Sequence, residues 1–330
     1  MADAHAWLTL VEKIHVGLCT PILGAGAAHH ALPLAKDLAE ELLRKEEALT
    51  GTAPLLVRND LAKVAQYIAV RRKDNVHPKL KIAEHLKTHV ANQRKDNVSI
   101  KTRLVERLKQ SANRHFHSPD EPHRALAALR LPIYLTTNYD DLMYKALEDE
   151  GVSPVREVAR WNSSLLEDVP SQFDHGYEPT PKTPLVFHIH GHWDIPESMV
   201  ATDDDYLDFI VNISRDLATS PTGPSKKAML PPRVRRALTS TTLLFIGYSL
   251  ADMDFKVILR GLVGSLAPSM RQMSVSVQHC SGRPGDLEKY IEDYFGHTLR
   301  LSVFWYSAHE FCHAMNKKVN KQLARAVAAG

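Results

Sequence analysis

The chain has 330 residues, of which 44% are hydrophobic, and its formal net charge is only +3. This length can bury one large α/β core or two smaller ones, and the near-neutral charge argues against nucleic-acid binding over the whole surface. Cys19, Cys280 and Cys312 are scattered and odd in number, which argues against disulfides and against a zinc site of cysteine pairs. No apolar run reaches a membrane span and the N-terminus has no signal pattern, so we expect a cytoplasmic protein without membrane contact.

The first predicted unit is a helix, a buried strand, a glycine turn and a second helix. Apolar spacing predicts the helix over residues 4–18, the strand over 19–23 and the second helix over 34–45. The turn Gly24-Ala25-Gly26 lies where backbone N–H groups of such units face an anionic ligand. Taken alone, a turn that needs positive φ explains the glycines without any ligand.

Residues 51–131 contain helical patterns and basic loops without a clear strand, which predicts a helical insertion between two strands. Between Arg71 and Arg114 there are 13 Lys or Arg residues against four acidic ones. Such a stretch suits a phosphate backbone or an acidic partner, and it is also typical of a solvated helix face. No Phe, Tyr or Trp interrupts it to stack on a base, so direct nucleic-acid binding is not favoured.

Asn138 marks the point where the next strand gives way to a helix. The strand is predicted over residues 131–135 and the helix over 140–150, so Asn138 falls at the carboxyl end of the strand. Open α/β sheets bind ligands at such ends. Asn and Asp are also favoured helix caps, so this motif alone more often indicates a cap than a catalytic site.

After this point strands and helices alternate. Further strands are predicted over residues 185–189, 243–246, 273–277 and 301–304, and helices over 205–214, 232–239, 252–262 and 286–295. This alternation predicts an α/β fold of the Rossmann-like type, with a mostly parallel sheet, helices on both faces and the helical insertion. We expect a single domain over 1–330, in which 300–330 add the last strand and a C-terminal helix, and 160–183 form a long loop near the site.

Four predicted strand ends carry polar or glycine motifs, and parallel strands would open all four on one edge of the sheet. The motifs are Gly24-Ala-Gly26, residues 136–140, residues 188–192 and residues 245–249. In this order they resemble the sirtuin superfamily, and more closely the bacterial sirtuin-like NAD hydrolases of antiphage defence. The resemblance covers roughly residues 20–260. Two departures stand out: the chain lacks the zinc-binding cysteine pairs of deacylases, and Ala27-Ala28 stands where the family often has Ser.

The resemblance implies that NAD+ is the substrate and that Asn138 and His190 are the catalytic pair. Asn138 would fix a water or the nicotinamide ribose, Asp140 would contact the nicotinamide amide, and His190 would act as general base. The remaining NAD-binding positions would be Gly24, Ala25, Gly26, Thr137, Gly247, Ser249 and Asp252. Histidine suits this base because its unperturbed pKa is about 6.5.

The other histidines leave alternatives open. His188, His190 and His192 are two residues apart, so they lie on one face of a strand. His188 and His192 fit a role in packing or in support of the site. A zinc site would need a further cluster of Cys, Asp or Glu at ligand spacing, which the sequence does not have. The segment His309-Glu310-Phe-Cys-His313 matches the HExxH pattern of zinc peptidases, but no Glu or His follows it to complete the ligands. We treat this match as chance and expect no metal.

These observations predict an NAD+ hydrolase that depletes NAD+ as an effector of antiphage defence. Such an activity needs restraint, so we expect homo-oligomerisation or a co-encoded partner, such as an ATPase, an Argonaute-like protein or another enzyme. The basic insertion is a candidate docking surface. The alternatives are a non-catalytic module that binds NAD+ or ADP-ribose, which the missing Ser after Gly26 favours, and a deacylase or ADP-ribosyltransferase.

Overall fold

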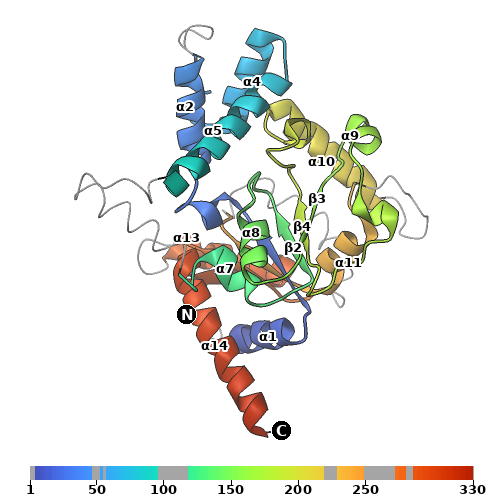
Figure 1. Cartoon of the computed structure of the whole chain (residues 1–330). Helices are drawn as coiled ribbons and strands as arrows, with labels where there is room; N and C mark the ends of the chain where they lie inside the picture. The colour runs from blue at the N-terminus through green and yellow to red at the C-terminus, as the bar shows by residue number, and fades with distance from the viewer. Residues whose placement is uncertain are drawn as a thin grey trace.

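The computed structural model describes residues 4–46, 53–54, 57–95, 118–218, 229–248, 272–279 and 285–329. Within these residues, seven parallel strands form one sheet in the order β3-β4-β2-β1-β5-β6-β7. The strands are β1 (Cys19–Leu23), β2 (Ile133–Thr136), β3 (Val155–Val158), β4 (Leu185–His188), β5 (Thr242–Ile246), β6 (Ser274–Gln278) and β7 (Leu301–Trp305). The parallel sheet and the helices around it confirm the predicted α/β, Rossmann-like fold (Figure 1).

The strand β3 was not predicted. It is a four-residue edge strand that pairs only with β4, and two of its four residues, Arg156 and Glu157, are charged. The continuous apolar runs by which buried parallel strands are recognised are therefore missing. The other six strands lie where the sequence predicts them, with boundaries shifted by a few residues.

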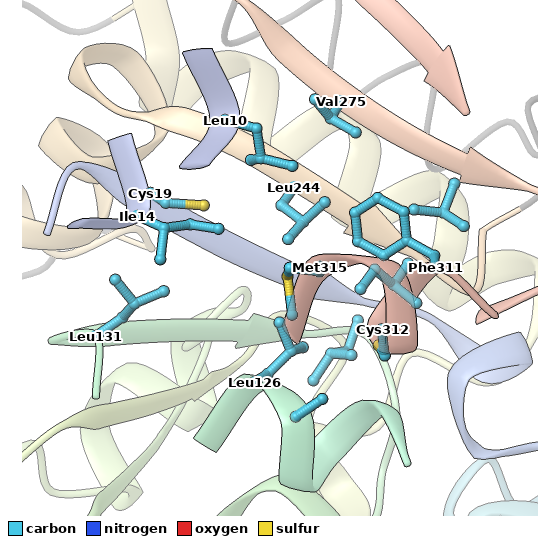
Figure 2. Packing of buried hydrophobic residues seen from close by; sticks show 14 of the residues in the cluster. Leu10, Ile14, Cys19, Leu126, Leu131, Leu244, Val275, Phe311, Cys312 and Met315 are labelled. Carbon is cyan, nitrogen blue, oxygen red and sulfur yellow. The ribbon is translucent and has the colours of Figure 1, made fainter. Parts of the chain in front are cut away.

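Alternate residues along each strand pack against opposite layers of helices. In β5, Leu243 and Phe245 face a core covered by α9 (Ser163–Asp168), α10 (Asp203–Ala218), α11 (Pro232–Ser240) and α13 (Asp286–Leu299). Leu244 and Ile246 face the opposite core, covered by α1 (Ala4–His15), α7 (Pro122–Ala127), α8 (Leu142–Asp149) and α14 (Ala308–Ala329). Figure 2 shows this second core, where Leu10, Leu126 and Phe311 approach Leu244 from three different helices.

A third core belongs to a group of helices at one end of the molecule, formed by α2 (Ala35–Lys45), α4 (Leu61–Arg72) and α5 (Val76–Lys95) (Figure 1). The buried Glu46 carboxylate accepts hydrogen bonds from Arg72 (2.6 Å) and pairs with His77 (3.0 Å). A second buried ion pair, Lys79 Nζ to Asp205 Oδ1 at 2.8 Å, attaches the group to α10. These contacts hold the three helices over the strand ends.

Part of the predicted basic insertion is described. It contains α4, α5 and α7, but α7 packs on the sheet and not with α4 and α5. Residues 96–117, which include the second half of the basic stretch, lie outside the described residues. In the described part of the chain, no helix has both the length and the apolar character needed to cross a bilayer.

Candidate functional site

A cavity of about 750 Å³ lies at the carboxyl ends of β1, β2, β4 and β5, beneath the group α2, α4 and α5. Its wall contains seven of the residues predicted from the sequence: Gly24, Ala25, Thr137, Asn138, Asp140, His190 and Gly247. Gly26 lies next to this wall, whereas Ser249 and Asp252 lie outside the described residues. The strand order changes direction around β1, and open α/β sheets bind ligands at such switch points.

The glycines of the first and last motifs are required by the close approach of two loops. Gly247 has φ +83°, and a Cβ there would lie 2.1 Å from the backbone N of Ala27. A Cβ on Gly24 would lie 2.7 Å from the Gly247 carbonyl oxygen, to which the Gly26 N–H donates at 2.9 Å. Gly24 and Gly26 do not have positive φ, so contact with Gly247, and not turn geometry, explains them. The interlocked loops bring backbone amides to the cavity wall.

Asn138 joins the loop after β2 to the loop after β1. Its side-chain Nδ2 donates to the Gly24 carbonyl at 3.2 Å, and its backbone N–H donates to Thr136 Oγ1 at 3.0 Å. Next to it, the hydroxyls of Thr137 and Tyr248 are hydrogen bonded at 3.0 Å. Asn138 therefore does not cap α8; its amide oxygen is the part of the side chain available to a ligand.

Asp140 presents one carboxylate oxygen that no described residue satisfies. Its Oδ1 accepts from the Leu142 N–H at 2.8 Å at the start of α8, whereas Oδ2 is buried without a hydrogen-bond partner. Burial raises the pKa of Asp140, and this outweighs the opposing effects of His123 and the Leu142 N–H. A buried polar atom without a protein partner on a cavity wall is a place where water or a ligand group can complete the hydrogen bond.

His190 also presents a polar atom without a partner. The ring is 3% exposed, its Nε2 has no hydrogen-bond partner among the described residues, and Tyr206 and Phe209 contact it edge to face. Burial lowers the pKa of His190 to about 3, so the ring is neutral at pH 7. This differs from the expected base with a pKa near 6.5, because the sequence does not reveal how completely the ring is enclosed.

Several cavity residues come from helices and were not predicted. Asp60 at the start of α4, Leu86 on α5, and Asp203 and Tyr206 on α10 complete the wall. The position of these four residues depends on how the helices pack over the sheet, which residue spacing does not give.

The HExxH segment serves as the beginning of a helix. Glu310 Oε2 accepts from the Ser307 N–H at 2.9 Å, and Ser307 Oγ accepts from the Glu310 N–H at 3.2 Å, which is a capping box for α14. His313 Nδ1 pairs with Asp120 at 2.7 Å, on the side of the molecule where α14 packs with α7. Neither histidine of the segment lines the cavity.

One group of described residues has the spacing of metal ligands, and it consists of Asp141, His192 and Asp194. Arg156 already lies at this position, with ion pairs of 2.5 Å to Asp141 and 3.3 Å to Asp194. A guanidinium therefore supplies the positive charge that these carboxylates face.

The sequence profile of the SIR2-like domain family matches residues 132–299, just over half of the chain. The chain belongs to the SIR2-like domain family. This confirms the sirtuin-like resemblance drawn from the motifs. Asn138, Asp140, His190 and Gly247 lie within the matched SIR2-like region, whereas the Gly24 loop precedes it and reaches the same cavity through β1.

Curated relatives of the chain carry the name NAD(+) hydrolase ThsA. The protein from Acinetobacter baumannii (strain 532279) is 29% identical over 141 residues, which cover 43% of this chain and 24% of that protein. The protein from Bacillus cereus (strain MSX-D12) is 26% identical over 173 residues, covering 52% of this chain and 31% of that protein. The chain thus spans about a quarter to a third of the length of these relatives.

Proposed function

We propose that this chain is an NAD+ hydrolase that releases nicotinamide and leaves ADP-ribose. The observation that carries the proposal is one cavity lined by Asn138, Asp140 and His190. Two buried polar atoms there, Asp140 Oδ2 and His190 Nε2, have no hydrogen-bond partner in the part of the chain that the structure describes. A volume of about 750 Å³ lies in the range of sites for small molecules and cofactors. The names of the curated relatives support the same reaction.

The interlocked loops suit the phosphate end of the substrate. Gly24, Ala25 and Gly247 lie on the cavity wall. The Gly24 N–H already donates to the Ile246 carbonyl at 2.9 Å, so the backbone N–H groups of Ala25 and Gly247 are those that would approach a pyrophosphate. The Thr137 hydroxyl lies on the same wall. By the family resemblance, Gly26 and Ser249 would join Gly24 and Gly247 in holding the pyrophosphate and the adenosine ribose, with Asp252 as their neighbour. Ser249 and Asp252 lie outside the described residues.

The reaction breaks the bond between C1′ of the ribose and the ring nitrogen of nicotinamide. The electron pair leaves with the ring, which becomes neutral, and the ribose carries the positive charge of an oxocarbenium ion. Water then attacks C1′, and its proton passes to the acceptor nitrogen of His190 and from there to solvent. Asp140 Oδ2 would accept from the carboxamide of nicotinamide. The Asn138 amide, held through its nitrogen by Gly24, would orient the water or a ribose hydroxyl with its oxygen.

A neutral His190 is suited to this charge distribution. A protonated ring would repel both the pyridinium of NAD+ and the cationic sugar, and burial prevents this by lowering the pKa of His190 to about 3. The neutral ring keeps one nitrogen as an acceptor for a ribose hydroxyl or for the attacking water. His190 therefore acts by accepting a hydrogen bond as charge develops on the ribose, and not by being ionised beforehand.

The test is nicotinamide release from NAD+ by the purified chain, measured with and without the product of the neighbouring gene. We expect Asn138→Ala and His190→Ala to lower turnover about 100-fold or more. His313→Ala is the matched control, since this histidine lies outside the cavity and should leave turnover unchanged. Turnover that persists in both cavity variants would overturn the proposal, and NAD+ binding without release under all conditions would favour a binding module.

We further propose that the activity serves bacterial antiphage defence by depleting NAD+, under the control of homo-oligomerisation or a co-encoded partner. Unrestrained NAD+ cleavage would harm the host cell. The basic insertion over residues 51–131 offers a docking surface for an acidic partner protein. The mass of the chain in solution, alone and with the neighbouring gene product, tests this control. A protein that is always monomeric and always active would contradict it.

A further inference from the structure

The first and last residues of the third motif, His188 and His192, contact the loop that carries Asn138 and Asp140, although neither lines the cavity. His188 Nδ1 lies 2.9 Å from the backbone oxygen of Asn138, and His192 Nε2 lies 3.1 Å from Asp141 Oδ1. Both side chains are fully buried. The two contacts thus hold the first and last residues of the segment 138–141.

The contact partner fixes the tautomer of His188. A carbonyl oxygen can only accept, so Nδ1 of His188 must carry the proton and donate it to Asn138. The other ring nitrogen, Nε2, is buried without a hydrogen-bond partner among the described residues. Burial lowers the pKa of His188 to about 3, which keeps the ring neutral.

His192 has the opposite tautomer. Its Nδ1 accepts from the backbone N–H of Asp194 at 3.2 Å, so Nε2 carries the proton and donates it to Asp141. Burial alone would raise the pKa of Asp141, but the His192 hydrogen bond and the nearby Arg156 outweigh it and lower the pKa to about 2. Asp141 is therefore a fixed negative acceptor.

Tyr139, which lies between the two anchored residues Asn138 and Asp141, is held as well. The Trp193 backbone N–H donates to the Tyr139 carbonyl at 3.0 Å, and the Tyr139 hydroxyl donates to the Val200 carbonyl at 2.6 Å. Segment 138–141 is thus tied to the β4 end at residues 138, 139 and 141. Asn138 and Asp140 of this segment line the cavity, and Asp140 Oδ2 has no hydrogen-bond partner among the described residues.

We propose that His188 and His192 are positioning residues, which hold Asn138 and Asp140 at the cavity by donating hydrogen bonds from opposite ring nitrogens. The inference rests on the proposed function, because it assigns the two histidines to the placement of the NAD+-cleaving groups. A displacement of about 1 Å in a catalytic group is enough to lower the rate considerably, without loss of binding through other groups.

The variants follow from the two tautomers. Asn places an N–H donor close to the position of Nδ1, and Gln places one close to the position of Nε2, whereas Phe keeps the ring volume and removes both. We expect His188→Phe and His192→Phe to lower kcat for nicotinamide release about tenfold or more, with KM for NAD+ and Kd for ADP-ribose changed less than about threefold. His188→Asn and His192→Gln should restore most of kcat.

A merely structural role predicts a different result. The Phe variants would then lower the melting temperature while kcat at a temperature well below it stays at the wild-type value, and the Asn and Gln variants would behave no better than Phe. Either result would overturn the positioning role of the two histidines.

The tautomers give a readout that does not depend on activity. In chain labelled with ¹⁵N-histidine, two-bond imidazole spectra should show protonated Nδ1 for His188 and protonated Nε2 for His192, assigned by the signals lost in each Phe variant. The same tautomer at both residues would overturn the proposal. Should the expected tautomers be found in a wild-type chain that never releases nicotinamide, the proposed function fails and the arrangement of donors stands.

Discussion

The segments 188–192 and 309–313 both place histidines within five residues, but they lie in different surroundings. His188 ends β4, an inner strand of the parallel sheet, and His190 and His192 follow it; all three are 0–3% exposed. The His313 side chain, by contrast, is 52% exposed on α14. In the first segment, His188 Nδ1 and His192 Nε2 are hydrogen bonded to the loop after β2. In the second, the glutamate caps its own helix. The number and spacing of histidines therefore indicate chemistry less well than their position on the fold does.

The largest effect is expected at Gly191, which allows the chain to turn directly after His190. Gly191 has φ +84°, and an added Cβ would lie 2.1 Å from the Ser198 carbonyl oxygen. Gly191→Ala combines backbone strain with a backbone clash and should lower the free energy of unfolding by about 3 kcal/mol or more. Urea unfolding measures this change. Ala314→Gly in α14, beside the second segment, should lower the free energy of unfolding by only about 1 kcal/mol. Equal losses of stability in the two variants would contradict the difference drawn between the surroundings of the two segments.

The next effect compares Asp140, which lines the cavity together with His190, and Asp120, which pairs with His313. Asp140→Asn keeps an acceptor for the Leu142 N–H but turns an amide donor toward the cavity, so it should lower kcat/KM for NAD+ about 10- to 100-fold. Asp120→Asn, at the partner of His313, is the matched control and should leave kcat/KM unchanged. Similar losses in both variants, measured by nicotinamide release, would remove the distinction between the two segments.

The buried histidines also predict how stability depends on pH. In the folded chain the pKa of His188 and of His190 is lowered to about 3, while the unfolded chain binds a proton on each below about pH 6.5. The unfolded state therefore binds more protons between these values, and stability falls as the pH falls through this window. Each histidine should contribute about 2 kcal/mol to the loss between pH 7 and pH 5.

The measurement is urea unfolding of wild type and His190→Phe at both pH values. The variant should lose about 2 kcal/mol less than wild type on going from pH 7 to pH 5, since Phe has no proton to bind. An identical loss in the two proteins would show that the buried ring does not resist protonation.

The sequence predicted those parts of the molecule that depend on local patterns. Apolar runs give six of the seven strands of the described sheet, and their carboxyl ends give Asn138, Asp140 and His190 on one cavity wall. The strand β3 was missed because its charged residue Arg156 is stabilised by ion pairs with Asp141 and Asp194, which lie far from it in the sequence. The neutral state of His190 was missed for the same kind of reason, since Phe209 and Tyr206 enclose the ring from another element.

The smallest expected effect tests the second segment directly. In Ser307-Ala-His-Glu310 the serine and glutamate have the spacing of a capping box, a signal that was present in the sequence beside the HExxH pattern. Ser307→Ala and Glu310→Gln should each lower the free energy of unfolding by about 1 kcal/mol or less, with no change in nicotinamide release and no change in zinc content. Stoichiometric zinc that is lost with His309→Ala would instead make this segment a metal site. The capping geometry argues against that outcome, because the glutamate that a metallopeptidase would use as a base is already held by the backbone N–H and hydroxyl of Ser307.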